Sequence, residues 1–101
     1  MAMPIKSHGK KTADYLAKAV PTVCFGLEVI SNGTDAIRVD LWDSEDADST
    51  GDVWLGAIDI GATPGAAAKT QGLWFGPNGV HCSKGLWADL TGTGEFTVYT
   101  E

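Results

Sequence analysis

An acidic segment offers the first candidate chemistry in this chain. Asp46, Asp48 and Thr50 stand at alternate positions and Gly51 comes sixth, as in a calcium-binding loop. The twelfth position of such a loop supplies a bidentate carboxylate, and here it is Ala57. The flanking segments also have strand patterns where a calcium loop needs helices. We therefore expect a solvated acidic turn and no metal site.

Two further segments contain residue types that are found in active sites. Residues 61–70 have the Gly, Lys and Thr of a phosphate-binding loop, but no glycine directly precedes Lys69 and no helix pattern follows. His81 and Cys82 are adjacent in a strand pattern, so their side chains point to opposite faces and cannot form a base–nucleophile pair. The sequence therefore predicts no enzyme and no cofactor.

Four tryptophans are the most informative large side chains: Trp42, Trp54, Trp74 and Trp87. Trp42, Trp54 and Trp87 alternate with the aliphatic residues of their strands, which predicts that they point away from the core. Exposed aromatic rings mark either a protein interface or a platform on which sugars stack. If the register is wrong, or if both faces are covered, the three are ordinary core residues.

The elements that would carry these side chains are short strands. The chain from Thr22 alternates with a period of two and is divided by glycine-containing turns, so we predict an all-β fold. We expect a single small antiparallel β-sandwich, jelly-roll-like, with six or seven strands, spanning residues 22–101. The expected strands are 22–30, 36–42, 53–60, 72–75, 80–82, 86–90 and 95–99. The expected core consists of Val23, Phe25, Leu27, Val29, Ile37, Val39, Leu41, Leu55, Ile58, Leu73, Leu86, Leu90, Phe96 and Val98.

Turn chemistry predicts how these strands connect. Residues 31–34 contain Asn-Gly, which accepts the positive φ of a tight hairpin turn. Residues 77–79 and 91–94 supply further turns, and the low-complexity segment 61–70 is expected to cross between the two sheets.

Residues 1–21 form a basic N-terminal arm. The first twenty residues carry a net charge of +3, whereas the other 81 carry −9. Residues 12–19 are expected to form a short helix, or else to stay extended and order only on a partner. A basic arm beside an acidic body suggests docking on an acidic surface, through Lys6, Lys10, Lys11, Tyr15, Leu16 and Lys18. The acidic body disfavours nucleic-acid binding.

The remaining composition constrains the class of protein. The chain shows no apolar run that could span a membrane and no secretory signal, so we expect it to be made in a cytosol. Cys24 and Cys82 fall in strand patterns that would allow them to pair. In a cytosolic product we expect two buried free thiols.

The pattern from Val23 to Tyr99 resembles a class of small structural proteins from the virions of tailed bacteriophages. The likeness is carried by the glycine-rich closing segment, residues 78–94, followed by a last strand that ends in Val98 and Tyr99. The resemblance implies a non-enzymatic head decoration or cement protein that binds the major capsid protein. It also implies a homo-oligomer, a dimer or trimer, located on the capsid surface. A tail, neck or fibre component and a carbohydrate-binding β-sandwich module are the alternatives.

Overall fold

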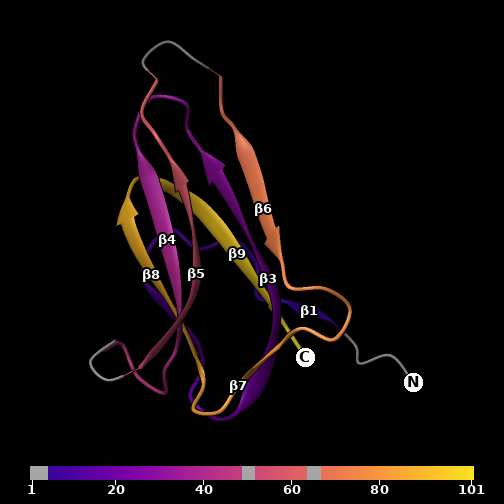
Figure 1. The fold of residues 1–101 in the computed structure, drawn as a ribbon. Coiled ribbons are helices and arrows are strands. Elements are labelled where there is room, and N and C mark those ends of the chain that lie inside the picture. The colour runs from indigo at the N-terminus through magenta and orange to yellow at the C-terminus, as the bar shows by residue number, and fades with distance from the viewer. Residues whose placement is uncertain (1–4, 49–51, 64–66) are drawn as a thin grey trace.

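The computed structural model of the chain describes residues 5–48, 52–63 and 67–101, and within them it is an all-β sandwich. Two antiparallel sheets pack face to face (Figure 1). This confirms the predicted fold class. The strands are β1 (Lys6–Ser7), β2 (Tyr15–Lys18), β3 (Thr22–Ser31), β4 (Ile37–Asp43), β5 (Val53–Ile60), β6 (Thr70–Trp74), β7 (Val80–Cys82), β8 (Leu86–Gly92) and β9 (Gly94–Thr100).

Each sheet combines strands that are distant in the sequence. Sheet A has the order β1-β9-β3-β6, with β7 also paired to β3, and sheet B has the order β2-β8-β4-β5. The β4–β8 pair is nested inside the β3–β9 pair along the chain, which is pairing of the jelly-roll kind. The central ladder of each sheet is therefore formed by residues from opposite halves of the sequence.

The Asn-Gly turn does not join a hairpin, so that part of the turn prediction is wrong. Gly33 has φ +86°, and the Asn32 side chain accepts hydrogen bonds from the backbone N–H groups of Thr34 and Asp35. The local turn forms, but β3 and β4 lie in different sheets. Turn chemistry sets the local backbone path, whereas the burial of both apolar faces decides which strands pair. Residues 61–63 and 67–69 do connect sheet B to sheet A, as predicted.

Strands β6 and β7 run in the same direction along one edge of β3. Trp74 is paired with Gly26, and Val80 resumes the pairing at Cys24. Residues 75–79 are not part of the ladder with β3, and the chain returns to the same edge of β3 at Val80. Gly79 has φ +66°, and a Cβ there would lie 2.6 Å from a methyl group of Val23. The predicted turn at residues 77–79 is therefore an excursion within one edge, not a reversal of the chain.

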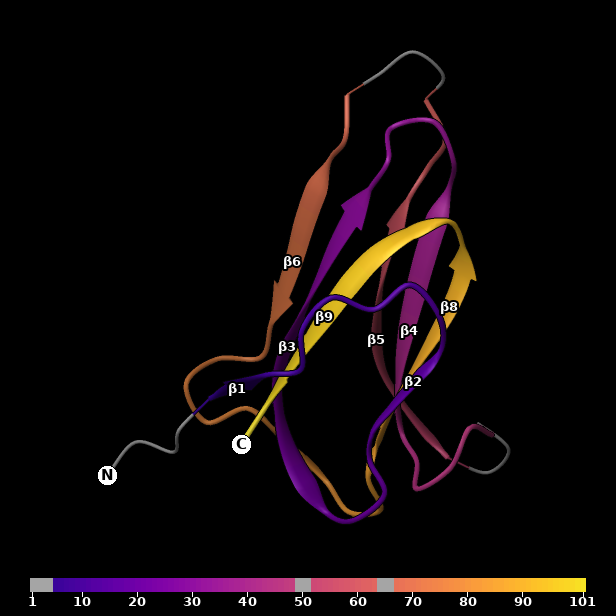
Figure 2. The same ribbon diagram turned by 180° about the vertical axis from the view of Figure 1, so that it is seen from behind.

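The arm is extended and is part of the sandwich. β1 pairs with β9, Lys11 forms a bridge with Phe96, and β2 pairs with β8. The arm thus crosses from sheet A to sheet B along one side of the molecule (Figure 2). The predicted helix over 12–19 is wrong, because residues 15–18 form β2. An isolated two-turn helix is marginal, and pairing with β8 offers Tyr15, Leu16 and Lys18 cross-strand partners instead.

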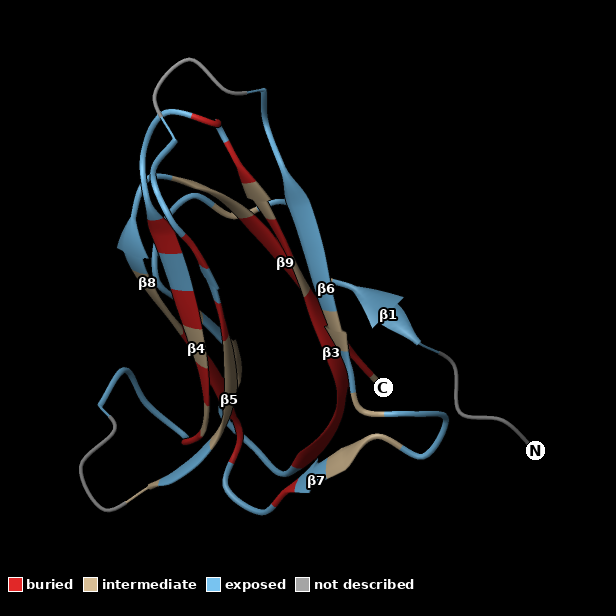
Figure 3. Cartoon of the chain, turned by 45° about the horizontal axis from the view of Figure 1, so that its top comes forward, coloured by how far each residue is buried: buried red, intermediate tan, exposed pale blue. Residues whose placement is uncertain are grey.

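The core lies between the two sheets, where the inner faces of β3, β4, β8 and β9 are buried (Figure 3). Every predicted core residue is at least partly buried, with Leu55, Leu73 and Leu90 at the margin. Val23 and Phe25 are buried but lie outside the core cluster, which contains Cys24, because the register of β3 shifts between Cys24 and Gly26. Cys24 and Cys82 are both fully buried free thiols. Burial raises the pKa of Cys24 to about 12 and that of Cys82 to about 11. The described residues include no helix with the length and apolar character that crossing a membrane requires.

Candidate functional site

Three tryptophans lie side by side across the outer face of sheet B. Trp42 on β4 is paired with Trp87 on β8 and with Trp54 on β5. Leu16 on β2 is the cross-strand partner of Trp87. We call these four residues the apolar stripe, since they cross all four strands of the sheet. None of them belongs to the buried core cluster, so the predicted register of the tryptophans is confirmed.

Exposure varies along the apolar stripe. Trp54 is 52% exposed and Leu16 is 38% exposed, whereas Trp42 is partly buried. Trp87 is only 7% exposed, so the expectation that it projects into solvent is wrong. In the part of the chain that the structure describes, the indole N–H groups of Trp42 and Trp87 have no hydrogen-bond acceptor. The stripe is thus covered in its middle and open to solvent at its two ends.

A carboxylate beside Trp42 fixes the segment that leads into Trp87. Asp43 accepts hydrogen bonds from the backbone N–H of Ser83 (2.9 Å), Lys84 (2.9 Å) and Gly85 (3.3 Å), and from the Ser83 hydroxyl (3.1 Å). Burial by itself raises the pKa of Asp43, but these donors outweigh that effect and lower it. The carboxylate therefore holds β4 and the start of β8 in the register that pairs the two tryptophans.

Charged residues surround the end of the apolar stripe that is formed by Trp54. The Trp54 indole N–H donates to Asp40 at 3.1 Å, and the Arg38 guanidinium binds both oxygens of Asp40 at 2.9 and 3.0 Å. Arg38 also reaches Asp59 at 3.4 Å. Arg38 and Asp40 thus form an ion pair on the outer face of sheet B. It holds the Trp54 ring in place from its polar edge.

The outer face of sheet B is also acidic on the β8 side of Asp40. Asp89 is opposite Asp40 in the ladder, and Asp14 accepts a hydrogen bond from the backbone N–H of Leu90. Burial, together with the negative charges of Asp14 and Asp40, raises the pKa of Asp89. A surface with this charge repels phosphates.

The predicted arm residues contact the chain's own body. Lys10 pairs with Glu95 at 3.6 Å, and the Lys11 ammonium lies 4.3 Å from the centre of the Tyr15 ring. Tyr15 and Leu16 are in β2 with Lys18, while Lys6 is in β1. His8 contacts the Tyr15 hydroxyl at 2.9 Å and the Thr100 hydroxyl at 2.8 Å. Of the arm residues proposed for an interface, Leu16 lies in the apolar stripe beside the tryptophans.

Trp74 is an exposed aromatic residue that the sequence analysis did not assign to an interface. It is 56% exposed on the outer face of sheet A, where its ring lies over Gly26 and 5.0 Å from the Tyr99 ring. A Cβ on Gly26 would lie 2.7 Å from the Trp74 ring. The glycine within strand 22–30 was the available signal, because a strand glycine often marks a close approach.

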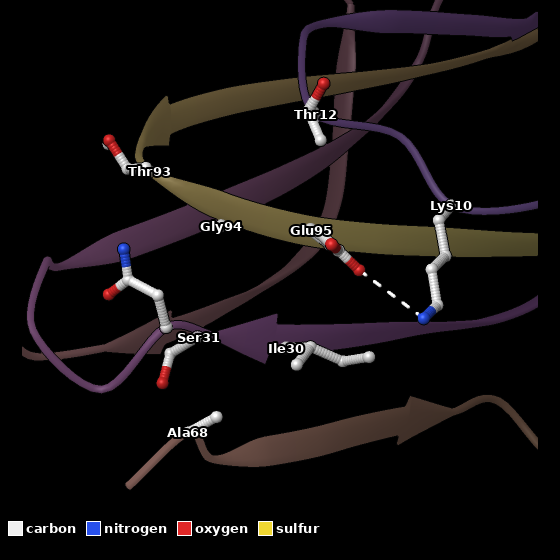
Figure 4. Close-up of a pocket in the computed structure, with 10 residues that line it drawn as sticks. Lys10, Thr12, Ile30, Ser31, Ala68, Thr93, Gly94 and Glu95 are labelled. Carbon is white, nitrogen blue, oxygen red and sulfur yellow. Dashed lines mark ion pairs between the residues drawn. The ribbon is translucent and has the colours of Figure 1, made fainter. Parts of the chain in front are cut away.

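A recess of about 530 Å³ opens at one end of sheet A, between the arm and the start of β9 (Figure 4). Its two charged side chains, Lys10 and Glu95, pair with each other across the opening. Ser31 accepts a hydrogen bond from the Lys69 backbone N–H at 3.2 Å. Since these groups are satisfied within the chain, we assign the recess no ligand.

The candidate catalytic and metal residues do not come together. His81 is exposed while its neighbour Cys82 is buried. No group of three or more His, Cys, Asp or Glu side chains is placed to hold a metal within residues 5–48, 52–63 and 67–101. Residues 49–51 of the acidic segment lie outside the described residues. The Ser44 hydroxyl oxygen, just before this segment, lies 2.8 Å from the backbone carbonyl oxygens of both Asp46 and Asp48, to which its one O–H can donate.

Comparisons of the chain with family models, with curated proteins and with solved structures gave no match. The arguments about function therefore come from the residues and the geometry of this chain.

Proposed function

We propose that this chain is a non-enzymatic structural protein of a tailed-bacteriophage virion, most specifically a head decoration protein. In this proposal it binds the major capsid protein in the assembled head and stabilises the shell from its outer surface. The chain is made in the host cytoplasm and then becomes part of the virion.

The observation that carries the proposal is the apolar stripe. A solvent-facing sheet surface is normally polar, yet here Leu16, Trp87, Trp42 and Trp54 cross the whole of sheet B. Trp54 presents half of its surface to water, and its indole N–H donates a hydrogen bond to Asp40. Pre-ordered tryptophans of this kind contribute a large share of the binding free energy at protein interfaces. The stripe therefore suits docking on a protein surface.

The surroundings of the stripe add a second argument. Acidic groups flank it at Asp40, Asp59, Asp89 and Asp14. This charge keeps an isolated subunit soluble and favours a partner with basic groups around an apolar patch. A protein that binds only the assembled lattice adds its binding free energy to the stability of the shell.

The experiment is co-sedimentation of the purified protein with phage heads that lack it, beside free major capsid protein. We expect stoichiometric binding to heads at fixed lattice points and none to the free subunit. Trp54→Ala should weaken binding at least roughly tenfold, as is typical of a tryptophan that becomes buried at an interface. Trp74→Ala is the matched control, because it removes an equally exposed tryptophan from the opposite sheet.

Other outcomes of this experiment would redirect the proposal. Binding to tails, necks or fibres in place of heads would assign the chain to that part of the virion. A loss of head binding in Trp74→Ala, but not in Trp54→Ala, would move the docking surface to sheet A.

A carbohydrate-binding module is the second candidate, and the environment of Trp54 favours it. An exposed indole ring beside the polar groups of Asp40, Arg38 and Asp59 combines a stacking surface with hydrogen-bonding groups. Quenching of tryptophan fluorescence by oligosaccharides, absent in Trp54→Ala, would support this function over the virion one.

A further inference from the structure

Strand β5 is a long sheet edge, and among the described strands none is hydrogen-bonded to its outer side. It pairs with β4 from Val53 to Ile60, and sheet B ends there. The opposite edge of sheet B is β2, which has four residues and a register shift. In sheet A, the β1 edge has two residues, and the β6 and β7 edge is interrupted at residues 75–79. Among the described strands, β5 is thus the longest continuous edge.

This edge lacks most of the features that protect sheet edges from pairing. β5 contains no lysine and no proline, and Asp59 is its one charged residue. Its ladder is irregular at a single place, where the register shifts between Leu41 and Trp42 and leaves Leu55 unpaired. Residues 56–60 beyond that bulge are regular. An unprotected edge of this kind is a template for another strand.

We propose that the occupant of the β5 edge is a second copy of this chain, paired antiparallel about a two-fold axis at Ile58. About this axis, Ile58 lies opposite its own copy and Gly56 lies opposite Ile60, so the two copies make the same contacts. The joined sheet then contains eight strands, four from each copy. A two-fold axis closes this assembly as a dimer, so no free β5 edge is left.

Two considerations determine the register of the β5–β5 pair: the face of the sheet to which each side chain points, and the charge of the side chains. Residues opposite each other in an antiparallel pair point to the same face, so the axis must pass through a residue. An axis at Asp59 would place two carboxylates directly opposite each other, which is unfavourable. An axis at Ala57 would bring the unpaired Leu55 into the ladder. An axis at Ile58 uses only residues 56–60 and sets Asp59 opposite Ala57.

The same register leaves each Asp59 with its own counter-charge. The Arg38 guanidinium lies 3.4 Å from Asp59 within each copy. The two Asp59 side chains are then diagonal neighbours, each already paired with an arginine. In the dimer, the outer faces of sheet B from the two copies form one continuous surface. The Trp54 end of each copy's apolar stripe lies toward the middle of that surface. The dimer does not depend on the function proposed above, because it is a property of the isolated protein.

Sedimentation equilibrium of the full chain over a concentration series tests the proposal. We expect a reversible monomer–dimer equilibrium. Ala57→Asp places a carboxylate opposite Asp59 of the second copy twice per dimer, and should raise the dissociation constant roughly tenfold or more. Ala57→Lys places an ammonium there and should not weaken the dimer. Thr91→Asp is the control, because it adds the same charge to the same face on β8.

A monomer at all concentrations, or equal weakening by Ala57→Asp and Thr91→Asp, would overturn the proposal. Ala57 also faces Asp40 within the chain, so the melting temperature of each variant is measured to exclude unfolding.

A second measurement does not depend on the stability of the charged variants. Ala57→Cys and Asp59→Cys proteins are mixed and oxidised, and we expect a disulfide-linked dimer from the mixture. Either protein alone should give much less, since residues 57 and 59 face each other only across the two copies. The native thiols are fully buried and do not interfere. Equal cross-linking in all three samples would exclude this register.

Discussion

The imidazole Nε2 of His8 and the hydroxyl of Thr100 lie 2.8 Å apart, although 92 positions separate the two residues in the sequence. The Thr100 hydroxyl donates to the carbonyl of Glu101 at 3.1 Å, so it accepts the hydrogen bond from Nε2–H. Nδ1 then accepts from the Tyr15 hydroxyl at 2.9 Å. We assign the neutral Nε2–H tautomer from these partners. One histidine thus joins the arm to the last strand.

This arrangement predicts a loss of stability in mild acid. Burial lowers the pKa of His8 from its usual 6.5, and three nearby lysines lower it further: Lys18, Lys11 and Lys6. The unfolded chain therefore takes up the proton first as the pH falls below 6.5, which favours unfolding. The contribution of neutral His8 is complete above pH 6.5 and decreases below it.

His8→Gln is the matched variant, because an amide donates and accepts hydrogen bonds but does not titrate. Thermal melts from pH 8 to pH 5 should show the wild-type protein losing stability relative to His8→Gln below pH 6.5. Parallel curves for the two proteins across that range would contradict the role given to His8.

The arm contributes to the stability of the body. The sequence analysis treated residues 1–21 as an appendage, yet deleting residues 1–20 removes β1, β2 and the His8 hydrogen bonds. We expect the free energy of unfolding to fall by at least about 2 kcal/mol, which lowers the melting temperature by roughly 10 °C. Deleting residues 1–4 leaves all the described strands in place and is the control. Calorimetry that finds the two truncated proteins equally stable would show that the arm is dispensable for folding.

Gly26 leaves space for the Trp74 ring. A Cβ at residue 26 would lie 2.5 Å from the Leu73 carbonyl oxygen and 2.7 Å from the Trp74 ring. Gly26→Ala should destabilise the protein by about 1–3 kcal/mol and change the near-UV circular dichroism of Trp74. At Gly61, a Cβ would meet nothing within 4 Å, so Gly61→Ala should have little effect. If the two variants unfold at the same denaturant concentration, the close approach at Gly26 is not a constraint.

Much of the sandwich follows from local pattern, because a period of two assigns each residue to a face. That pattern located most strands, the core face and the side of the sheet on which Trp42, Trp54 and Trp87 lie. It could not show that neighbouring groups would cover Trp87, since burial depends on strands that are distant in the sequence. Trp74 was missed for the same reason, because its position depends on pairing with Gly26.

Strand pairing and the arm were the parts that local reasoning did not predict. The turn residues at Asn32 and Gly33 form a tight turn whether the next strand stays in the sheet or leaves it. Residues 12–19 have reasonable helix propensity, but a free edge on β8 competes for them with backbone hydrogen bonds along β2. Both outcomes depend on which edges remain unpaired after the core forms, and that is a property of the whole chain.

The Asp43 carboxylate is expected to be critical for the position of Trp87. Asp43→Asn keeps the size of the side chain but replaces one acceptor oxygen with a donor. It should therefore destabilise the protein by roughly 2–4 kcal/mol and change the tryptophan fluorescence. Glu45→Gln makes the same chemical change at an exposed site two residues later and should be nearly neutral. Urea unfolding of the two variants, monitored by tryptophan fluorescence, tests this prediction. Equal free energies of unfolding for the two variants would contradict it.

The pairing of β3 with β9 has a consequence for synthesis of the protein. Val29 in the first half of the chain is paired with Phe96, and β1 also depends on β9. Sheet A therefore cannot be completed on the ribosome until the seven residues of β9 have left the exit tunnel. Until then, β3 lacks β9, the partner with which it forms its longest ladder. In a nascent chain, sheet A is therefore completed only after β9 has emerged.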